Sequence, residues 1–302
     1  MPTSTAANQA TPATGAGPQA IELSAGVIDY RDTGGDGPPI VLLHGLLMDA
    51  TLWDDVVADL SPAHRCIVPT LPLGAHRRPM AADADLSLSG VARLVRELIE
   101  RLGLHEATVA GVDTGGAIVQ LLMVDRPPAM ARAVLISCDA FDNFPPGATG
   151  KMLVLSGRLS PALFGLFMQQ LRLRLVRRLP IAFGWLTKRG DATTRRWLDP
   201  LLAQPAIRRD AVRVLREIAA HRSLLVQTAE RLPGFAHPAL VLWAERDRVM
   251  PPEHAHRLGE VLPDARVVEV PDTYTLIPLD QPARLAQLIG EFVGDAAPTA
   301  AG

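Results

Sequence analysis

The chain has 302 residues and a formal net charge of −2, with 48 % hydrophobic and 21 % charged residues. This composition is typical of globular proteins and excludes a fibrous or wholly disordered chain. No apolar run approaches the ~20 residues that a membrane-spanning helix needs. The two cysteines, Cys66 and Cys138, are too few for a disulfide framework or a zinc cluster, and we expect each to be a core residue of a separate strand. We therefore expect a cytoplasmic protein with no membrane contact, no metal and no cofactor.

The expected elements alternate along the chain. Residues 1–18 have neither the basic start nor the apolar middle of a signal peptide, so we expect a disordered tail there and a second one at 296–302. Short apolar runs that stop at turn-prone or charged residues predict strands at 26–31, 40–43, 65–68, 107–110, 133–137, 239–243 and 266–270. Helical spacing predicts helices at 52–60, 87–104, 114–124, 253–261 and 282–293. This alternation predicts an α/β fold, with a parallel sheet covered by helices on both faces.

The alternation stops between residues 143 and 234, where the pattern is almost entirely helical. Within 162–179, one apolar stripe is formed by Leu163, Phe164, Phe167, Met168, Leu171 and Leu175, with Arg174, Arg177 and Arg178 off the stripe. We therefore predict a helical cap at 143–234, inserted into an α/β core formed by residues 19–142 and 235–295.

Charge is distributed unevenly between these two parts. From Lys151 to Phe235 the chain has 16 basic and 5 acidic residues, a net charge of +11, against −13 for the remainder. This asymmetry is compatible with a solvated surface, with an anionic substrate, or with an acidic carrier protein bound at the cap. Nucleic acid is not an expected partner, because the arginines are not interleaved with aromatic residues.

The segment from Val109 to Ala117 contains the pattern that indicates chemistry. A strand runs into a sharp turn, Gly111-Val112-Asp113-Thr114-Gly115, and a helix begins at once. This is the form of a nucleophile elbow, Gly-x-Nuc-x-Gly, in which small residues permit a tight crossing of strand and helix. Asp113 occupies the nucleophile position, although an aspartate there could also simply cap the helix.

Other segments in the right order and spacing carry a resemblance. His44-Gly45 is followed by Trp53, the run Trp243 to Asp247 has an acidic end, and Pro271-Asp272 begins a loop that continues to Pro282. With the elbow, these motifs over residues 21–293 resemble the α/β-hydrolase superfamily, and within it the haloalkane dehalogenase and epoxide hydrolase branch. The resemblance implies a mostly parallel eight-stranded sheet with helices on both faces and an inserted helical cap.

The resemblance also implies roles for individual residues. Asp113 would be the nucleophile and Asp247 the acid of the site. The backbone N–H groups of Leu46 and Thr114 would form an oxyanion hole, and His44 would brace the loop that carries Leu46. An aspartate nucleophile suits displacement at an sp³ carbon, whereas its attack on an ordinary ester would give a high-energy anhydride.

One residue of the family pattern is missing. Family members have a histidine in the loop after the last strand, where this chain has Thr275, preceded by Tyr274; both would border the substrate. Threonine cannot replace imidazole as a general base. Of the eight histidines, His76 follows a strand at the expected active-site edge and is our candidate for a displaced base, with His221 of the cap as the alternative. His254 and His256 are expected at the surface.

Two further departures concern the leaving group. A dehalogenase of this family has a tryptophan after the nucleophile, where this chain has Thr114, and an epoxide hydrolase has cap tyrosines, which this chain lacks. Trp185 and Trp197 of the cap could bind a halide or be buried in the cap. Asp139 and Asp142 are weaker candidates than Asp247 for the acid.

Three functions remain open. The first is hydrolysis of an epoxide or alkyl halide, with a small or medium apolar substrate, through an ester on Asp113. The second is a non-hydrolytic elimination, isomerisation or cyclisation, with Asp113 as a general acid or base. The third is a ligand-binding protein without turnover. In each case the partner is a small molecule, and the chain is a monomer or a homodimer.

Overall fold

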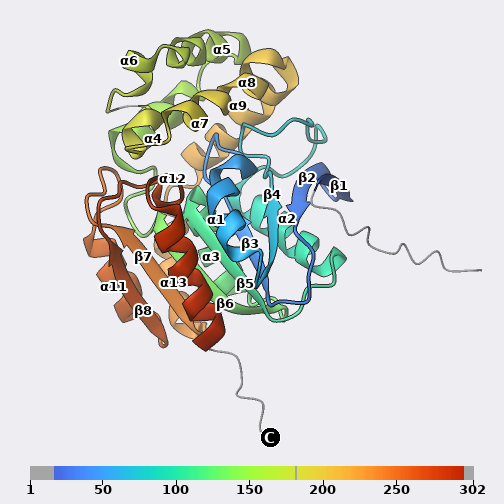
Figure 1. Cartoon of the computed structure of the whole chain (residues 1–302). Coiled ribbons are helices and arrows are strands. Elements are labelled where there is room, and N and C mark those ends of the chain that lie inside the picture. Colours follow the sequence, from blue (N-terminus) through green and yellow to red (C-terminus); the bar gives the residue numbers. More distant parts are fainter. Residues whose placement is uncertain (1–16, 181, 296–302) are drawn as a thin grey trace, which may run out of the picture.

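The computed structural model describes residues 17–180 and 182–295. Its centre is one eight-stranded sheet in the order β1-β2-β4-β3-β5-β6-β7-β8 (Figure 1). Its strands are β1 (Pro18–Leu23), β2 (Gly26–Asp32), β3 (Pro39–Leu43), β4 (Arg65–Pro69), β5 (Ala107–Asp113), β6 (Met130–Cys138), β7 (Ala239–Ala244) and β8 (Ala265–Val270). β1 and β2, and β2 and β4, pair antiparallel, and all other neighbours pair parallel. The α/β fold class is confirmed.

All seven strands expected from the sequence are present, and one is added. β1 begins at Pro18, so the tail predicted at 1–18 ends one residue too late. Residues 1–16 and 296–302 of the two predicted tails lie outside the described residues. The apolar pattern does not predict β1, because β1 is an edge strand that alternates in exposure and lacks a continuous apolar run. β8 is likewise half exposed, unlike the fully buried β5. Cys66 and Cys138 are buried free thiols on β4 and β6, which are not neighbours in the sheet.

Helices cover both faces of the sheet. On one face, α1 (Asp54–Leu60) packs against α13 (Pro282–Asp295), and on the other α2 (Leu88–Arg101) packs against α3 (Thr114–Asp125). α11 (Glu253–Val261) lies against β7 and β8. The amphipathic spacing of α2 directs Val91, Leu94 and Leu98 into the core, and Ser87 caps its first turn by accepting from Gly90 N. Short helices η1 (Ala50–Trp53) and α12 (Ile277–Asp280) lie beside α1.

The cap consists of short helices between β6 and β7, beyond one end of the strands (Figure 1). They are α4 (Gly147–Ser156), α5 (Pro161–Gln169), η2 (Gln170–Arg172), α6 (Arg174–Arg177), η3 (Phe183–Leu186), α7 (Asp191–Arg196), α8 (Leu198–Ala203), α9 (Pro205–Ala220), α10 (Leu224–Ala229) and η4 (Leu232–Gly234). None of the described helices is long and apolar enough to cross a membrane.

The apolar stripe predicted within 162–179 is wrong in part. The helix breaks after Gln169, so the helical spacing does not continue, and only Phe164, Met168 and Leu171 of the stripe are buried. Leu175 is 86 % exposed. Arg177, predicted to lie off the stripe, is nevertheless buried, because it pairs with Asp191 and donates to the carbonyl of Leu171.

Candidate active site

The turn between β5 and α3 holds Asp113 in a conformation that few non-glycine residues adopt. Its φ of 55° and ψ of −130° are strained, and α3 begins at the next residue, Thr114. A Cβ atom at Gly111 would lie 2.4 Å from the backbone of Gly115, and one at Gly115 would lie 2.4 Å from the carbonyl oxygen of Leu43. The two glycines are therefore required by close backbone contact, and this crossing presents Asp113 at the carboxyl end of the sheet.

The carboxylate of Asp113 is held by two backbone donors. Its Oδ1 atom accepts from Leu46 N at 3.2 Å and from Thr114 N at 2.7 Å, the two N–H groups that the family resemblance implies for an oxyanion hole. A Cβ atom at Gly45 would lie 2.3 Å from this oxygen, so Gly45 makes room for the carboxylate. Both donors reach the same oxygen, which leaves Oδ2 free of backbone donors. The Asp113 side chain thus has one fixed and one available oxygen.

A second carboxyl group lies behind the elbow. Thr114 Oγ1 donates to Asp139 Oδ2 at 2.9 Å, and Asp139 Oδ1 has no hydrogen-bond partner among the described residues. Burial raises the pKa of Asp139 well above its usual value, and the charge of Asp113 adds to this effect. Burial also raises the pKa of Asp113, although its backbone hydrogen bonds oppose the shift. The two groups therefore disfavour each other's ionisation.

Asp247 and Thr275 form the other side of the site. Asp247 Oδ1 accepts from the backbone N–H groups of Val249 and Met250 and, at 2.7 Å, from Thr275 Oγ1. The second oxygen, Oδ2, is buried and has no partner within the described residues. Burial raises the pKa of Asp247. Thr275 is fully buried, and its hydroxyl donates to Asp247. A threonine hydroxyl cannot act as a general base at neutral pH.

The structure places His76 against the cap. Gly74 N donates to its Nδ1, and its Nε2 donates to Asp210 Oδ2 of α9 at 3.3 Å. Both ring nitrogens are occupied, and His76 does not border the cavity at Asp113. His221 is exposed beside Glu217, so it does not point down from the cap. His254 is 6 % exposed and packs against Phe141, so its expected surface position is wrong.

His44 is a structural support in this geometry. Its Nδ1 donates to the carbonyl of Gly45, and Leu71 N donates to its Nε2 at 2.8 Å. Burial lowers the pKa of His44 to about 4, so the ring is neutral at pH 7. A neutral ring with both nitrogens engaged fixes the loop that carries Leu46, which is the bracing role that the resemblance implies.

Tyr274 lies in a separate shallow hollow. The guanidinium of Arg248 lies 3.5 Å from the centre of its ring and 3.9 Å from that of Trp185. These side chains line a hollow together with Arg178 and Lys188, and none of them borders the Asp113 cavity. Trp197 is buried and donates to Thr51 Oγ1 at 3.0 Å. Neither cap tryptophan therefore reaches a leaving group at Asp113.

Two adjacent cavities lie near the elbow, one between the elbow and the cap and the other inside the cap. The first has a volume of about 30 Å³, room for about two water molecules. It is bordered by Asp113, Thr114, Leu46, Met48, Pro146, Thr149, Gly150, Leu153, Phe183, Leu186 and Val249. The second, within the cap, has about 240 Å³ and shares Thr149, Leu153 and Phe183 with the first. Both are lined mainly by apolar side chains, so this region of the molecule suits an apolar ligand once the three shared side chains move.

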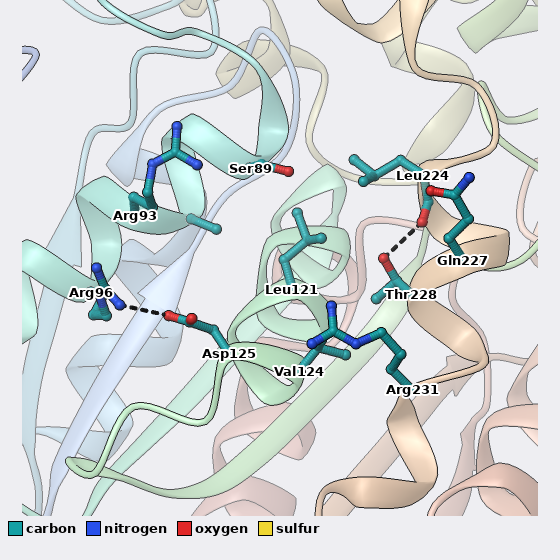
Figure 2. A pocket seen from close by; sticks show the side chains of 11 residues that line it. Ser89, Arg93, Arg96, Leu121, Val124, Asp125, Leu224, Gln227, Thr228 and Arg231 are labelled. Atoms are coloured by element: carbon teal, nitrogen blue, oxygen red, sulfur yellow. Dashed lines mark hydrogen bonds and ion pairs between the residues drawn. The ribbon is translucent and has the colours of Figure 1, made fainter.

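A larger cavity lies elsewhere. Figure 2 shows this groove of about 410 Å³ between α2, α3 and α10, with Arg93, Arg96 and Arg231 along it. Arg96 pairs with Asp125 within the groove, and Arg93 pairs with Asp85. The groove shares no residue with the Asp113 cavity, so it is separate from the elbow.

The cap is fastened to the core along one side. Asp210 of α9 accepts from Met80 N as well as from His76, and Arg213 donates to the carbonyls of Ala81 and Ala84. Trp197 and Thr187 bond to Thr51 and Asp280, respectively. In contrast, no hydrogen bond or ion pair within the described residues joins 147–177 to the core. The family pattern did not reveal Asp210, because its partners lie about 130 residues away in the sequence.

Known proteins resemble this chain in sequence and in fold. The model of a family described as "Alpha/beta hydrolase family" matches residues 40–288. Haloalkane dehalogenase 2 of Mycobacterium tuberculosis is 29 % identical over 282 residues, covering 91 % of this chain and 94 % of its own. A cis-3-alkyl-4-alkyloxetan-2-one decarboxylase of Xanthomonas campestris is 26 % identical over 293 residues, covering 91 % and 95 %. The crystal structure of a putative ancestral haloalkane dehalogenase superposes with a TM-score of 0.72 at 21 % identity, covering 92 % of this chain and 98 % of its own.

Proposed function

Because the chain belongs to the alpha/beta hydrolase family, we propose that it is an enzyme that displaces a leaving group from an sp³ carbon through an ester on Asp113. The observation that carries this proposal is that the two carboxylate oxygens of Asp113 differ in their hydrogen bonds. Oδ1 is fixed by Leu46 N and Thr114 N, and Oδ2 has no backbone donor and belongs to a side chain that borders the apolar cavity.

The chemistry follows from these contacts. With an alkyl halide, Oδ2 forms a bond to carbon while the carbon–halogen bond breaks, and halide leaves with the bonding electrons. With an epoxide, a ring C–O bond breaks and the alkoxide takes a proton from solvent. In both cases Oδ1 becomes the carbonyl oxygen of the ester. Water attack on that ester would develop negative charge on Oδ1, which is already positioned between two N–H donors.

The cavity supports a small or medium apolar substrate. Its side walls are Leu46, Met48, Leu153, Phe183 and Val249, and no indole or tyrosine hydroxyl borders it among the described residues. A good leaving group, such as bromide, needs the least help from such donors. The relative named as a haloalkane dehalogenase supports halogenated alkanes as the first substrates to test.

Hydrolysis of the ester is expected to be slow. No histidine is among the described residues that border the cavity, and Thr275 stands against Asp247. A missing general base typically costs about 10²–10⁴ in rate. The alkyl-enzyme ester should therefore accumulate.

A non-hydrolytic reaction is the second candidate. The same Thr275–Asp247 contact favours it, because elimination, isomerisation or cyclisation needs no activated water. The relative named as a decarboxylase of an alkyl-substituted oxetanone is consistent with such chemistry on a strained apolar ring. In this case Asp113 acts as a general acid or base, or its ester collapses without water.

Intact-mass spectrometry after incubation with 1-bromohexane tests the proposal. We expect a stable gain of one hexyl group, located on the peptide that contains Asp113 and absent in Asp113→Asn. Asp54→Asn, an exposed aspartate on α1, is the matched control and should be alkylated as wild type. Absence of the adduct together with the absence of hexanol contradicts the first candidate.

The same assay separates the alternatives. Turnover of a strained ring without an adduct, abolished in Asp113→Asn, supports the non-hydrolytic reaction. If Asp113→Asn changes neither turnover nor ligand binding, both enzymatic candidates are wrong. Because burial raises the pKa of Asp113, the alkylation rate should rise with pH through the range in which this carboxyl ionises.

A further inference from the structure

The exposed apolar side chains of the molecule are concentrated on part of the cap. Among the described residues, seven of the eight large ones lie between residues 152 and 179: Met152, Leu155, Leu163, Leu166, Leu173, Leu175 and Leu179. The eighth, Val226, lies on α10. Single exposed leucines are ordinary, but a cluster of this kind marks a surface that another body covers. We call these seven residues the leucine surface.

The same segment is basic. Residues 151–180 contain six basic side chains and no aspartate or glutamate. Arg177 is buried, and the other five are Lys151, Arg158, Arg172, Arg174 and Arg178. Asp191 is the nearest acid for three arginines, at 3.6 Å from Arg174, 2.9 Å from Arg177 and 3.9 Å from Arg178, and Asp199 lies 4.0 Å from Arg172. The leucine surface therefore keeps an excess of positive charge.

The elements that carry the leucine surface meet around one cavity. The cap cavity of about 240 Å³ is lined from α4, α5, η2 and α6, and two of its wall residues, Met152 and Leu179, belong to the leucine surface. Figure 1 shows α5 and α6 at the outer end of the cap, farthest from the sheet. The buried face of α5 packs on α8 and α9, which leaves Leu163 and Leu166 outside. The leucine surface thus extends from α4 to the segment after α6, and its α5 and α6 residues lie at this outer end.

We propose that the leucine surface docks on an anionic lipid bilayer. Leucines enter the boundary between headgroups and acyl chains, and the surrounding arginines and Lys151 contact the anionic headgroups. Charge distinguishes this occupant from a second copy of the chain, because two such basic faces would repel each other. An acidic carrier protein would match the charge, but its charged surface would not bury the seven exposed apolar side chains. This proposal replaces the expectation of no membrane contact, which rested on the absence of a spanning segment.

Vesicle sedimentation tests the docking. The full chain is mixed with vesicles of phosphatidylcholine alone or with phosphatidylglycerol at three parts in ten. We expect binding to the anionic vesicles only, and its loss at high salt, because ~1 M salt screens charges beyond about 3 Å. Leu173→Glu with Leu175→Glu should weaken binding at least about tenfold, since two buried leucines are lost and two like charges are added. Arg174→Gln should weaken it about fivefold.

Two control variants outside the leucine surface show whether binding depends on this surface. Val226→Glu is the apolar control, outside the leucine surface, and Arg246→Gln is the basic control, because the Arg246 side chain is 70 % exposed against 71 % for Arg174. Both should bind as wild type, and thermal melting should show all variants folded. The docking is contradicted if wild type does not bind anionic vesicles, or if the controls weaken binding equally. A stable dimer that Leu175→Glu dissociates, without vesicle binding, assigns the surface to self-association instead.

Discussion

The two sides of the site preserve different amounts of the family pattern. At the elbow, the glycines, the strained Asp113 and the two N–H donors form a complete cradle for a carboxylate. At the last loop, Asp247 accepts from the hydroxyl of Thr275, at the position where the family resemblance implies an imidazole. In the mechanism that we propose, forming an ester and cleaving it have separate requirements, and the contacts around Asp113 fit the first set. Four variants test the two sides of the site.

The largest expected effect belongs to Thr275→His. A base at this position should speed hydrolysis of the Asp113 ester by about 10²–10⁴, the range of general-base catalysis. The decay of the hexyl adduct, followed by intact mass, measures it. Thr273→His is the control, because Thr273 is equally buried but bonds to the carbonyl of Val270.

Both histidine variants add volume to a packed region, so thermal melting must show that each remains folded. An unchanged ester lifetime in a folded Thr275→His would mean that the missing imidazole is not what limits hydrolysis.

The second variant breaks the elbow side. In Gly45→Ala the new methyl group would lie 2.3 Å from Asp113 Oδ1 and displace it from its donors. Loss of one oxyanion-hole donor typically costs about 10²–10³ in rate, and we expect a similar fall in alkylation. Gly294→Ala, where nothing lies within 4 Å of the new atom, is the control. Alkylation at the wild-type rate in Gly45→Ala would show that the cradle does not position the nucleophile.

Asp139→Asn tests the buried carboxyl behind the elbow. Because burial raises its pKa in the folded state, the wild type loses stability as pH rises from the unfolded pKa, about 3.9, through the folded value. The amide carries no charge and keeps an acceptor for Thr114. At neutral pH we expect the variant to be more stable by roughly 1–3 kcal/mol, and below about pH 4 to match wild type. Melting temperatures across this pH range measure it; equal temperatures at pH 7 would contradict the raised pKa.

The smallest effect is expected for Asp247→Asn. An amide oxygen can accept the same three hydrogen bonds as Oδ1, and the Asp247 charge contributes only a minor part of the raised pKa of Asp113. Alkylation should therefore change by no more than roughly threefold, corresponding to about half a pKa unit. A loss as large as that of Gly45→Ala would show that the two sides act as one unit.

The sequence predicts seven of the eight strands, most helices of the core and the position of Asp113, because these depend on local periodicity and on close backbone contacts that only glycine permits. It does not predict contacts that the cap makes across long separations. The pairing of His76 with Asp210 joins positions 134 residues apart, and it removes His76 from the cavity. The burial of Arg177 depends on Asp191 and on a helix break that apolar spacing does not indicate.

The one-sided fastening of the cap also has a mechanical consequence. A cavity of about 30 Å³ beside Asp113 is too small for a hexyl chain, so entry requires movement of the wall that contains Thr149, Leu153 and Phe183. Asp210, Arg213 and Trp197 tie the α8–α9 half to the core, whereas α4–α6 have no polar tie in the part of the chain described. We therefore expect α4–α6 to move away from the core more readily than α8 and α9, and the rate of this opening to limit how fast a ligand reaches the carboxylate.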